Sequence, residues 1–591
     1  MSLSVCDLLG SPTRTLSSPA TVAEIRAAEQ PLLDAQGSVD ELMRSAASTV
    51  ARVASAMLGD AQRLIDAPSQ PHILVLAGAG GNGGDGLYAA AMLREQGWTQ
   101  VSAYRVSSSV HASAWQRFLD AGGTVVSDPA TMGRVDLLID AITGIGARPG
   151  LRPEAAAVLQ GLDVAQVLAV DIPSGVAADS GAAGEQHINA DVTVSFGAPR
   201  LAHVLSPACG TVLIGDIALD SATMPPLSEL IAQQIARRRA CTGLRAVYGR
   251  SQLQLEGYEC VGGHHGIADL SPGPEDDKYS GGVVGILAGS EDYIGAGVLC
   301  ATAAVRASSS MVRYVGALRA RVVERLPEVV SHPSLGECGQ VQCVVVGPGR
   351  GTDERAREEL LTALSMDVPV VVDADAITLL AELPKLRAAL AARQAPTVLT
   401  PHAGEFERLA AALDDELPGL SEHRVEACEK LAALLGITVL LKGHATIIAD
   451  PQQSTIVHTG VSWAATAGSG DVLAGILGAH LAWAEATEHI DTIEAVVSAV
   501  LVHSVAAALA AHTPYGPAPT SASAIAESIP AATAALIAHR KNAQALETFE
   551  NAAFIVQGRD TEVRRAVLNA DGEEAMIAAM SARFIASLQR G

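Results

Sequence analysis

The 591-residue sequence is poor in cysteine, in aromatic residues and in positive charge. Its eight cysteines include no Cys-x-x-Cys pair and follow no standard zinc spacing, so a disulfide scaffold and a zinc site are both disfavoured. The net charge of −24 argues against nucleic-acid and anionic-membrane partners. No uninterrupted apolar run approaches the roughly 20 residues of a membrane span, and no secretory leader is evident. These absences predict a cytoplasmic protein with mostly reduced thiols.

Length and composition predict a globular chain of at least two domains, because 49% of residues are hydrophobic and 591 residues exceed one core. Strand-like and helix-like stretches alternate in two arrays, which is typical of parallel sheets. Predicted strands cover 73–77, 101–106, 124–126, 137–140, 167–171 and 192–196, then 283–287, 311–315, 343–346, 368–372, 397–399 and 439–441. The predicted class is α/β, beginning with a Rossmann-like doubly wound domain.

The predicted boundaries divide the chain into four parts. They are a first domain at 1–225, a connector at 226–277, a second domain at 278–542 and a charged tail of unknown role at 543–591. An Ala-rich helical arm at 21–57 precedes the first predicted strand and makes self-association into a homo-oligomer an expectation.

Two glycine-rich motifs, at 80–86 and 467–471, each stand where a hydrophobic segment gives way to a helical pattern. Glycine lets the backbone approach a ligand closely, and the first N–H groups of a helix attract phosphate. The first motif is part of a G-x-G-x-x-G pattern, which alone is a weak dinucleotide signal. The acid expected about 20 residues later is missing near Arg105, so an ordinary NAD dehydrogenase is disfavoured. The two motifs predict two nucleotide-type sites.

Polar residues follow three strands of the first array. Because the carboxyl ends of parallel strands share one edge of a sheet, we expect convergence of Asn82, Asp85, Asp140, Asp171 and Ser174. Several carboxylates near a phosphate loop require a cation, and oxygen ligands suit a hard one. The alternative is that each Asp only caps the next helix or turn.

These motifs resemble the YjeF N-terminal family of NAD(P)H-hydrate epimerases over about residues 20–220. The resemblance lies in Asn82-Gly-Gly-Asp-Gly, Asp140-Ala-Ile-Thr-Gly, Asp171-Ile-Pro-Ser-Gly and Val194-Ser-Phe-Gly-Ala-Pro. It implies a potassium ion held by Asn82, Asp140 and Ser174, and acid–base work by Asp171. The implied hydrate-binding residues are Gly81, Asn82, Gly83, Gly84, Asp85, Gly144, Ile145, Gly146, Ala147, Arg148, Pro149, Gly150 and Asp171. Arg200-Leu departs from the common Pro-Lys.

The second glycine motif is the more specific signal. Gly468 and Gly470 allow a turn that directs N–H groups at phosphate, and Asp471 then stands at a helix N-terminus, where it can polarise a hydroxyl. Lys442-Gly-His-Ala-Thr446 follows a buried strand and suits a nucleotide phosphate or ribose. His402 alone is more often a structural hydrogen-bonding residue, but Thr-Pro-His-x-Gly-Glu favours ligand binding.

This second set resembles the YjeF C-terminal, or carbohydrate-kinase-like, family of ADP-dependent NAD(P)H-hydrate dehydratases on a ribokinase-like fold, over about residues 278–540. The resemblance implies ADP as co-substrate at Lys442, Gly443, His444, Ala445, Thr446 and Gly470. It implies hydrate binding at Ala296, Gly349, His402 and Asp471, with Asp471 catalytic, and allows magnesium in this domain. Asp276-Asp277-Lys278 and Gly281 depart from a more basic family pattern.

Together the resemblances imply a bifunctional enzyme that acts on NADHX and NADPHX, the hydrates of NADH and NADPH. The first domain is expected to interconvert the R and S epimers, and the second to dehydrate the S epimer with ADP. The alternative is a small-molecule kinase of the ribokinase superfamily carrying a non-catalytic ligand-binding domain.

Overall fold

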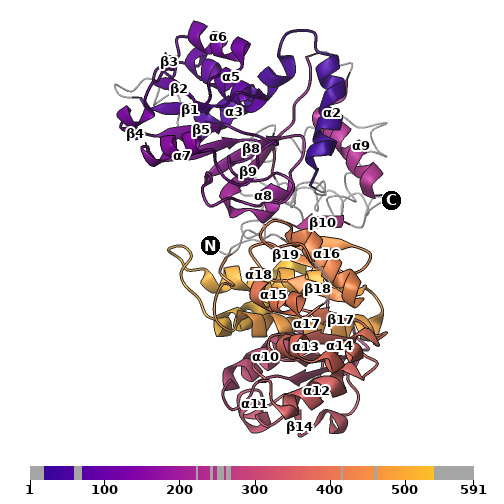
Figure 1. The fold of residues 1–591 in the computed structure, drawn as a ribbon. Helices are drawn as coiled ribbons and strands as arrows, with labels where there is room; N and C mark the ends of the chain where they lie inside the picture. The colour runs from indigo at the N-terminus through magenta and orange to yellow at the C-terminus, as the bar shows by residue number, and fades with distance from the viewer. Residues whose placement is uncertain are drawn as a thin grey trace, which may run out of the picture. The chain divides into compact units, whose positions relative to one another are not determined.

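The computed structural model describes residues 19–537 apart from 59–69, 221–223, 240–243, 249–257, 261–267, 414–416 and 458–461. The predicted tail at 543–591 lies outside these residues. Within them, the chain forms two large sheets of mainly parallel strands with helices on both faces, which confirms the predicted α/β class (Figure 1).

The first sheet has the strand order β11-β9-β8-β7-β5-β1-β2-β3, and every pairing except that of β11 with β9 is parallel. Its strands in chain order are β1 (Ile73–Ala77), β2 (Val101–Arg105), β3 (Thr124–Val125), β5 (Leu137–Ala141), β7 (Val167–Val170), β8 (Val192–Phe196), β9 (Thr211–Gly215) and β11 (Tyr258–Cys260). A small second sheet pairs β4 (Arg134–Val135) with β6 (Asp163–Val164).

The first domain packs helices on both faces of its sheet because side chains alternate along each strand. On β1, Ile73, Val75 and Ala77 join one apolar cluster, and Leu74 and Leu76 join another on the opposite face. The helices are α2 (Val22–Asp34), α3 (Glu41–Leu58), α5 (Gly81–Glu95), α6 (Ala112–Asp120), α7 (Pro153–Gln160), α8 (Leu201–Leu205) and α9 (Leu227–Arg239). The predicted helical arm at 21–57 comprises two helices, α2 and α3.

The second sheet has the order β10-β20-β19-β18-β17-β16-β15-β12-β13-β14 and is parallel from β18 to β14. Its strands are β10 (Leu244–Tyr248), β12 (Val284–Leu287), β13 (Val312–Val315), β14 (Val330–His332), β15 (Cys343–Val346), β16 (Val370–Val372), β17 (Thr397–Leu399), β18 (Thr438–Leu441), β19 (Thr446–Ala449) and β20 (Ser454–Val457). β18, β19 and β20 form an antiparallel meander.

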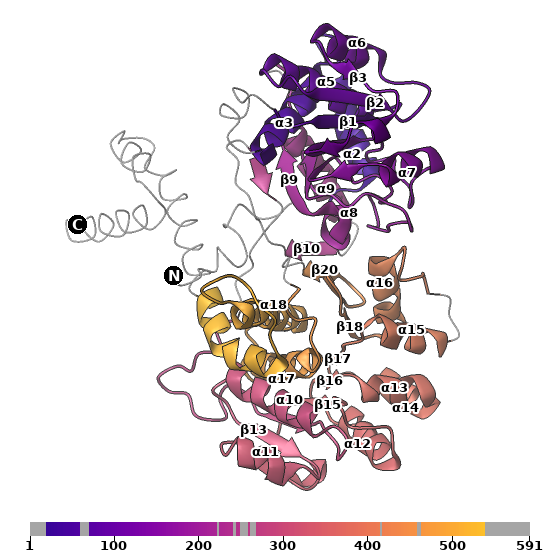
Figure 2. The ribbon, with the colours of Figure 1, turned by 90° about the vertical axis from the view of Figure 1, so that its left-hand side faces the viewer.

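The second domain is a three-layer α/β/α structure. Figure 2 shows α10, α17 and α18 on one face of the sheet and α12 to α16 on the other, and each face has its own apolar cluster. The labelled helices are α10 (Ile294–Ala307), α11 (Arg319–Arg325), α12 (Glu354–Leu364), α13 (Asp375–Glu382), α14 (Pro384–Ala391), α15 (Ala403–Ala411), α16 (Arg424–Leu435), α17 (Ser469–Thr487) and α18 (Thr492–Ala511). A further helix covers Ala522–Ile537 and packs in the same apolar cluster as α18. Helix α18 is long and apolar enough for a membrane span, but 78% of its apolar window is buried inside the protein, as in a core helix.

The predicted connector at 226–277 contains regular structure at three places. Helix α9 contributes Leu227 and Ile231 to the apolar core of the first domain, β11 pairs with β9, and β10 pairs with β20. Parts of this segment lie outside the described residues.

Candidate active sites at two sheet edges

Each large sheet has a point where its strand order reverses, and predicted site residues follow strands beside it: Asn82 follows β1, Ala296 follows β12 and Gly349 follows β15. In the first sheet, β1 lies between β2 and β5; in the second, β12 lies between β13 and β15. At such a switch point the loops from neighbouring strands diverge and leave a crevice at the carboxyl ends of the strands. Each domain therefore has a candidate binding edge built by its own loops.

The first glycine loop requires glycine for steric reasons. A Cβ at Gly83 would lie 2.1 Å from the carbonyl oxygen of Gly78, and a Cβ at Gly78 would lie 1.9 Å from that of Ile142. A Cβ at Gly84 would lie 2.5 Å from the Met43 sulfur. The loop therefore packs closely against the loop after β5, and helix α5 begins immediately at Gly81.

Asp140 and Ser174 form a buried polar pair beside this loop, and both side chains are fully buried. Ser174 donates to the Asp140 carboxylate from its backbone N–H and from Oγ, each at 2.7 Å, and Ile142 N donates at 3.2 Å. Thr143 N donates to Ser174 Oγ at 3.1 Å. Burial raises the pKa of Asp140 to about 6, although these hydrogen bonds act in the opposite direction. A cation at Asp140 would offset this cost.

The donor set at this place fits an alkali cation. Asn82, the third predicted ligand, has its side-chain Oδ1 3.0 Å from the position of a Cβ at Gly144, so this oxygen faces the loop after β5. The oxygens of Asp140, Ser174 and Asn82 are hard ligands that suit potassium better than a transition metal. No group of three His, Cys, Asp or Glu among the described residues has the arrangement of a metal centre.

Asp171 follows β7 and has an unusual backbone, with φ of 67° at a residue that is not glycine. Its Oδ1 accepts from Ser195 Oγ at 2.8 Å and pairs with the Arg200 guanidinium at 3.1 Å, and its backbone oxygen contacts His203 Nε2 at 2.8 Å. Burial lowers the pKa of His203 to about 4, and Arg200 acts in the same direction. The neutral ring therefore donates to the Asp171 carbonyl and holds it in place.

The predicted loop at 144–150 lies against this carboxylate. A Cβ at Gly144 would stand 3.0 Å from Asn82 Oδ1 and 3.1 Å from Asp171 Oδ2, so the three residues share one small space. Gly150 N donates to the Gly175 carbonyl at 2.9 Å, which fixes the far end of the loop. Between these points Ile145 and Ala147 are half-buried, and Gly146, Arg148 and Pro149 are exposed.

Two further carboxyl groups lie within electrostatic reach of Asp171. Burial raises the pKa of Asp85 well above its usual value, and the charges of Asp171 and Glu29 add to this. Burial also raises the pKa of Glu29 to about 7, with Asp171 acting in the same direction and Arg200 and Arg26 opposing it. Sequence reasoning missed Glu29, because it lies on α2, far along the chain from every glycine motif.

In the second domain, the Lys442 ammonium group lies close to polar groups from several segments at one edge of the sheet. Its Nζ donates to Asp373 Oδ1 at 2.8 Å and lies 3.8 Å from Glu405 Oε2. A Cβ at Gly470 would stand 3.7 Å from the same Nζ, so the ammonium group faces the first turn of α17. Burial alone would lower the pKa of Lys442, but Asp373, Glu405 and Asp471 together raise it. This places a fixed cation where helix N–H groups already favour an anion.

Asp471 lies in the same first turn of α17. Gly468 immediately before the helix has φ of 84°, which favours glycine, and a Cβ there would lie 3.8 Å from Asp471 Oδ2. Burial raises the pKa of Asp471 to about 6; Asp373 acts in the same direction and Lys442 opposes it. A carboxylate with a pKa near the working pH can accept and return a proton.

Ala296 and Gly349 lie together at the switch point of the second sheet. Gly349 has φ of 57°, and a Cβ there would stand 2.7 Å from the Ala296 side chain and 2.8 Å from the Tyr293 Cβ. Nearby, Gly351 N donates to Asp375 at 2.7 Å. Tyr293 is 62% exposed at this edge.

His402 has a structural role in addition to the predicted binding role. Its Nδ1 accepts from Gly404 N at 3.1 Å and Glu405 N at 3.4 Å, while Glu405 accepts from His402 N at 2.9 Å. This reciprocal cap starts α15. The side chain remains 59% exposed, so the capping role leaves ring surface open.

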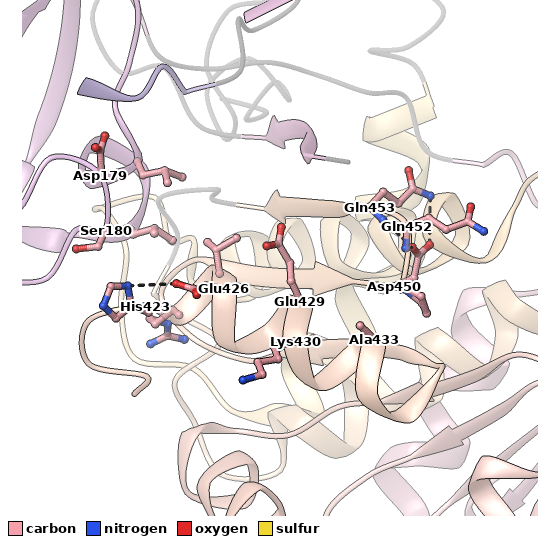
Figure 3. Close-up of a pocket in the computed structure, with 15 residues that line it drawn as sticks. Asp179, Ser180, His423, Glu426, Glu429, Lys430, Ala433, Asp450, Gln452 and Gln453 are labelled. Carbon is pink, nitrogen blue, oxygen red and sulfur yellow. Dashed lines mark hydrogen bonds and ion pairs between the residues drawn. The ribbon is translucent and has the colours of Figure 1, made fainter. Parts of the chain in front are cut away.

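Helix α16 flanks the predicted nucleotide loop at 442–446. The Arg424 guanidinium donates to the Lys442 carbonyl at 3.4 Å and lies against Gly443. Burial lowers the pKa of His444, and Arg424 acts in the same direction. Ala445 is buried and Thr446 begins β19. At the start of α16, His423 pairs with Glu426 at 3.5 Å (Figure 3).

Residues 276–278, which depart from the more basic family pattern, form an exposed turn. Asp277 Oδ1 accepts from Tyr279 N at 2.8 Å, and Lys278 lies 5.2 Å from the centre of the Tyr279 ring. The Asp277 carboxylate is thus engaged by its own turn.

Two α/β domains, each with a carboxylate beside a glycine-opened helix, define a protein with two nucleotide-type sites. Two family models match the chain: NAD(P)H-hydrate dehydratase over residues 284–531 and YjeF-related protein N-terminus over residues 39–202. A bifunctional NAD(P)H-hydrate repair enzyme of Corynebacterium glutamicum is 42% identical over 563 residues, covering 87% of this chain and 98% of the relative. One from Mycobacterium tuberculosis is 41% identical over 465 residues, covering 78% and 88%. The chain belongs to the family of bifunctional NAD(P)H-hydrate repair enzymes.

Among solved structures, an ADP/ATP-dependent NAD(P)H-hydrate dehydratase from Bacillus subtilis is 28% identical, with a TM-score of 0.38 over 45% of this chain and 94% of that chain.

Proposed function

We propose that the first domain interconverts the R and S epimers of hydrated NADH and NADPH, and that the second removes water from the S epimer with ADP as co-substrate. The observation that carries this proposal is that Asp171, after β7, shares a small space with Asn82 in the first turn of α5, and that Asp471 lies in the first turn of α17, each at an edge of its own sheet. Such an edge binds the phosphates through backbone N–H groups and leaves the carboxylate for proton transfer.

In the epimerase domain, Asp171 exchanges a proton with the substrate while Arg200 and Ser195 hold its carboxylate in one orientation. The loops at 81–85 and 144–150 bind the hydrate. Asn82, Asp140 and Ser174 would hold a potassium ion, which would supply positive charge near the substrate. The support for this ion is the all-oxygen donor set around the fully buried Asp140.

In the dehydratase domain, Asp471 takes the proton from the ring carbon next to the hydroxyl-bearing carbon, and the electron pair left behind forms the ring carbon–carbon double bond. The carbon–oxygen bond breaks as the hydroxyl takes a proton from solvent and leaves as water. Ala296, Gly349 and His402 bind the hydrated ring. Lys442 and the first turn of α17 bind the ADP phosphates, and the rest of the loop at 443–446 contacts the nucleotide. Asp373, 2.8 Å from Lys442, holds the ammonium group in position. A magnesium ion would bind with the phosphates of ADP.

The decisive assay supplies both epimers with ADP and follows the return of reduced-nicotinamide absorbance. The full chain should consume both epimers. Asp171→Ala should leave the R epimer behind, beyond its spontaneous conversion, and Asp471→Ala should prevent recovery of either. ATP-dependent phosphorylation of a small alcohol, without recovery of reduced cofactor, would contradict the proposal and favour a kinase.

We propose the cytoplasm as the compartment, because the five cysteines whose side chains the structure describes are all free and buried thiols. Self-association stays a prediction. Its basis was the apolar arm, and in the structure Ala47, Val50 and Ala54 of α3 pack in the core of their own domain. Sedimentation of the full chain over a concentration series will test it.

A further inference from the structure

The proposed epimerisation requires proton transfer on both faces of the substrate ring. Hydration places the hydroxyl on the carbon next to the ring nitrogen, so the nitrogen lone pair can expel it as water once an acid has protonated it. A new water must then add from the opposite face and lose a proton to a base. One carboxyl group cannot reach both faces at once. Asp171 supplies one of the two groups, and a second is needed.

Helix α2 brings a second carboxyl group to this site, and several contacts fix the helix. Ala20 N donates to the Pro199 carbonyl at 2.8 Å, and Val22 N donates to Asp179 at 2.8 Å. One turn later, the Arg26 guanidinium lies 3.9 Å from the position of a Cβ at Gly146, so it faces the hydrate-binding loop. Glu29 follows three residues on, on the same side of the helix, and is half-buried.

The charges around Glu29 come from four elements. They are Arg26 on α2, Asp85 on α5, Asp171 after β7 and Arg200 before α8. Burial and the neighbouring carboxylate of Asp171 raise the pKa of Glu29 to about 7, so near neutral pH a large share of the side chain is protonated. Asp171 instead pairs with the Arg200 guanidinium at 3.1 Å.

We infer that Glu29 is a second catalytic residue of the epimerase, which acts on the ring face opposite to Asp171. This inference rests on the proposed function. Glu29 gives its proton to the hydroxyl, the carbon–oxygen bond breaks, and the ring nitrogen lone pair forms the carbon–nitrogen double bond. Water then adds to the other face and gives its proton to Asp171. In the reverse direction the two residues exchange roles, and solvent restores their protonation states between turnovers.

The test uses the full chain, purified R epimer of hydrated NADH and no ADP, with the S epimer followed by chromatography. Glu29→Gln should lower kcat for epimerisation at least about a hundredfold, with a small change in KM. Glu29→Asp should retain part of the activity, with its loss at alkaline pH displaced from that of the wild type. Asp34→Asn, an exposed carboxylate of the same helix, should match the wild type. A thermal melt of the full chain reports folding of the first domain in each variant, and ADP-dependent dehydration of the S epimer reports that of the second.

One isotope label and two comparisons of rates separate the outcomes. In water enriched in heavy oxygen, every enzymatic epimerisation should place one solvent oxygen in the product hydroxyl; a product without label overturns the inference. A wild-type rate no faster than spontaneous conversion overturns the proposed epimerase function itself. An active wild type with Glu29→Gln within about threefold of its kcat overturns only the role of Glu29. If Glu29→Gln does not fold, Glu29→Asp provides the test. Loss of its epimerase activity at the same alkaline pH as in the wild type would also overturn the role of Glu29.

Discussion

Replacing Asp373 by Asn should move the acidic limb of the dehydratase pH profile to lower pH. Asp471 acts as a base, so it must be ionised, and the rate should rise with pH through its pKa of about 6. Besides burial, Asp373 is a cause that raises this pKa. The substitution also frees Lys442 from its partner at 2.8 Å, and Lys442 lowers the same pKa. Both effects therefore lower the pKa of Asp471.

The magnitude follows from the shift at Asp471. Its pKa rises from 3.8 to about 6, which corresponds to a cost of about 3 kcal/mol for ionising the side chain in place. The wild type is then about one-tenth ionised near pH 5 and about nine-tenths ionised near pH 7. Asp373→Asn should therefore change kcat little near neutral pH relative to its own plateau, but should raise the fraction retained near pH 5 several-fold.

The assay measures kcat with the S epimer and saturating ADP from about pH 5 to about pH 8. Glu354→Gln, an exposed carboxylate in the first turn of α12, is the matched control and should leave the limb in place. The electrostatic reasoning would be refuted if the acidic limb of the pH profile of Asp373→Asn stayed at the wild-type position or moved to higher pH. Asp471→Asn should have no measurable limb, because it has no titrating base.

Three further predictions concern the contacts of both sites. Gly144→Ala should abolish epimerisation and spare dehydration, because the methyl group would fill the space beside Asn82 and Asp171; parallel assays of the two epimers check this. Lys442→Met should weaken ADP binding at least about tenfold by calorimetric titration, and should lower the free energy of unfolding by about 3 kcal/mol because it leaves Asp373 buried without its cation. Arg200→Leu should lower epimerase kcat and thermal stability together, since Asp171 loses its buried partner, and Arg200→Lys should restore part of both, as a melting series would show.

The fold was predictable from the sequence because its signals are local. Strands β1, β8, β15 and β17 begin and end at the predicted residues, since each is a short apolar run followed by Gly, Pro or a polar residue. Their order explains why residues after separate strands, such as Asp140 and Ser174, meet at one edge. The antiparallel strands β19 and β20 were missed, because short runs outside the alternating pattern have little periodicity.

The partners of the site residues were not predictable in the same way. Nothing in the sequence near Glu29 indicates that α2 lies beside the strand ends of the first sheet. Arg200 was noticed only as a departure from a family pattern, and its ion pair with Asp171 spans 29 positions of the chain. Such pairings depend on how distant elements pack, and periodicity within one element carries no information about them.

The burial of the described thiols has a consequence for survival under oxidants. Peroxide reacts with the thiolate, and burial raises the pKa of Cys428 to about 12 and that of Cys300 well above its usual value. Near neutral pH these sulfurs are almost wholly protonated and shielded from solvent. In the described part of the chain, no cysteine is therefore an easy point of oxidative inactivation.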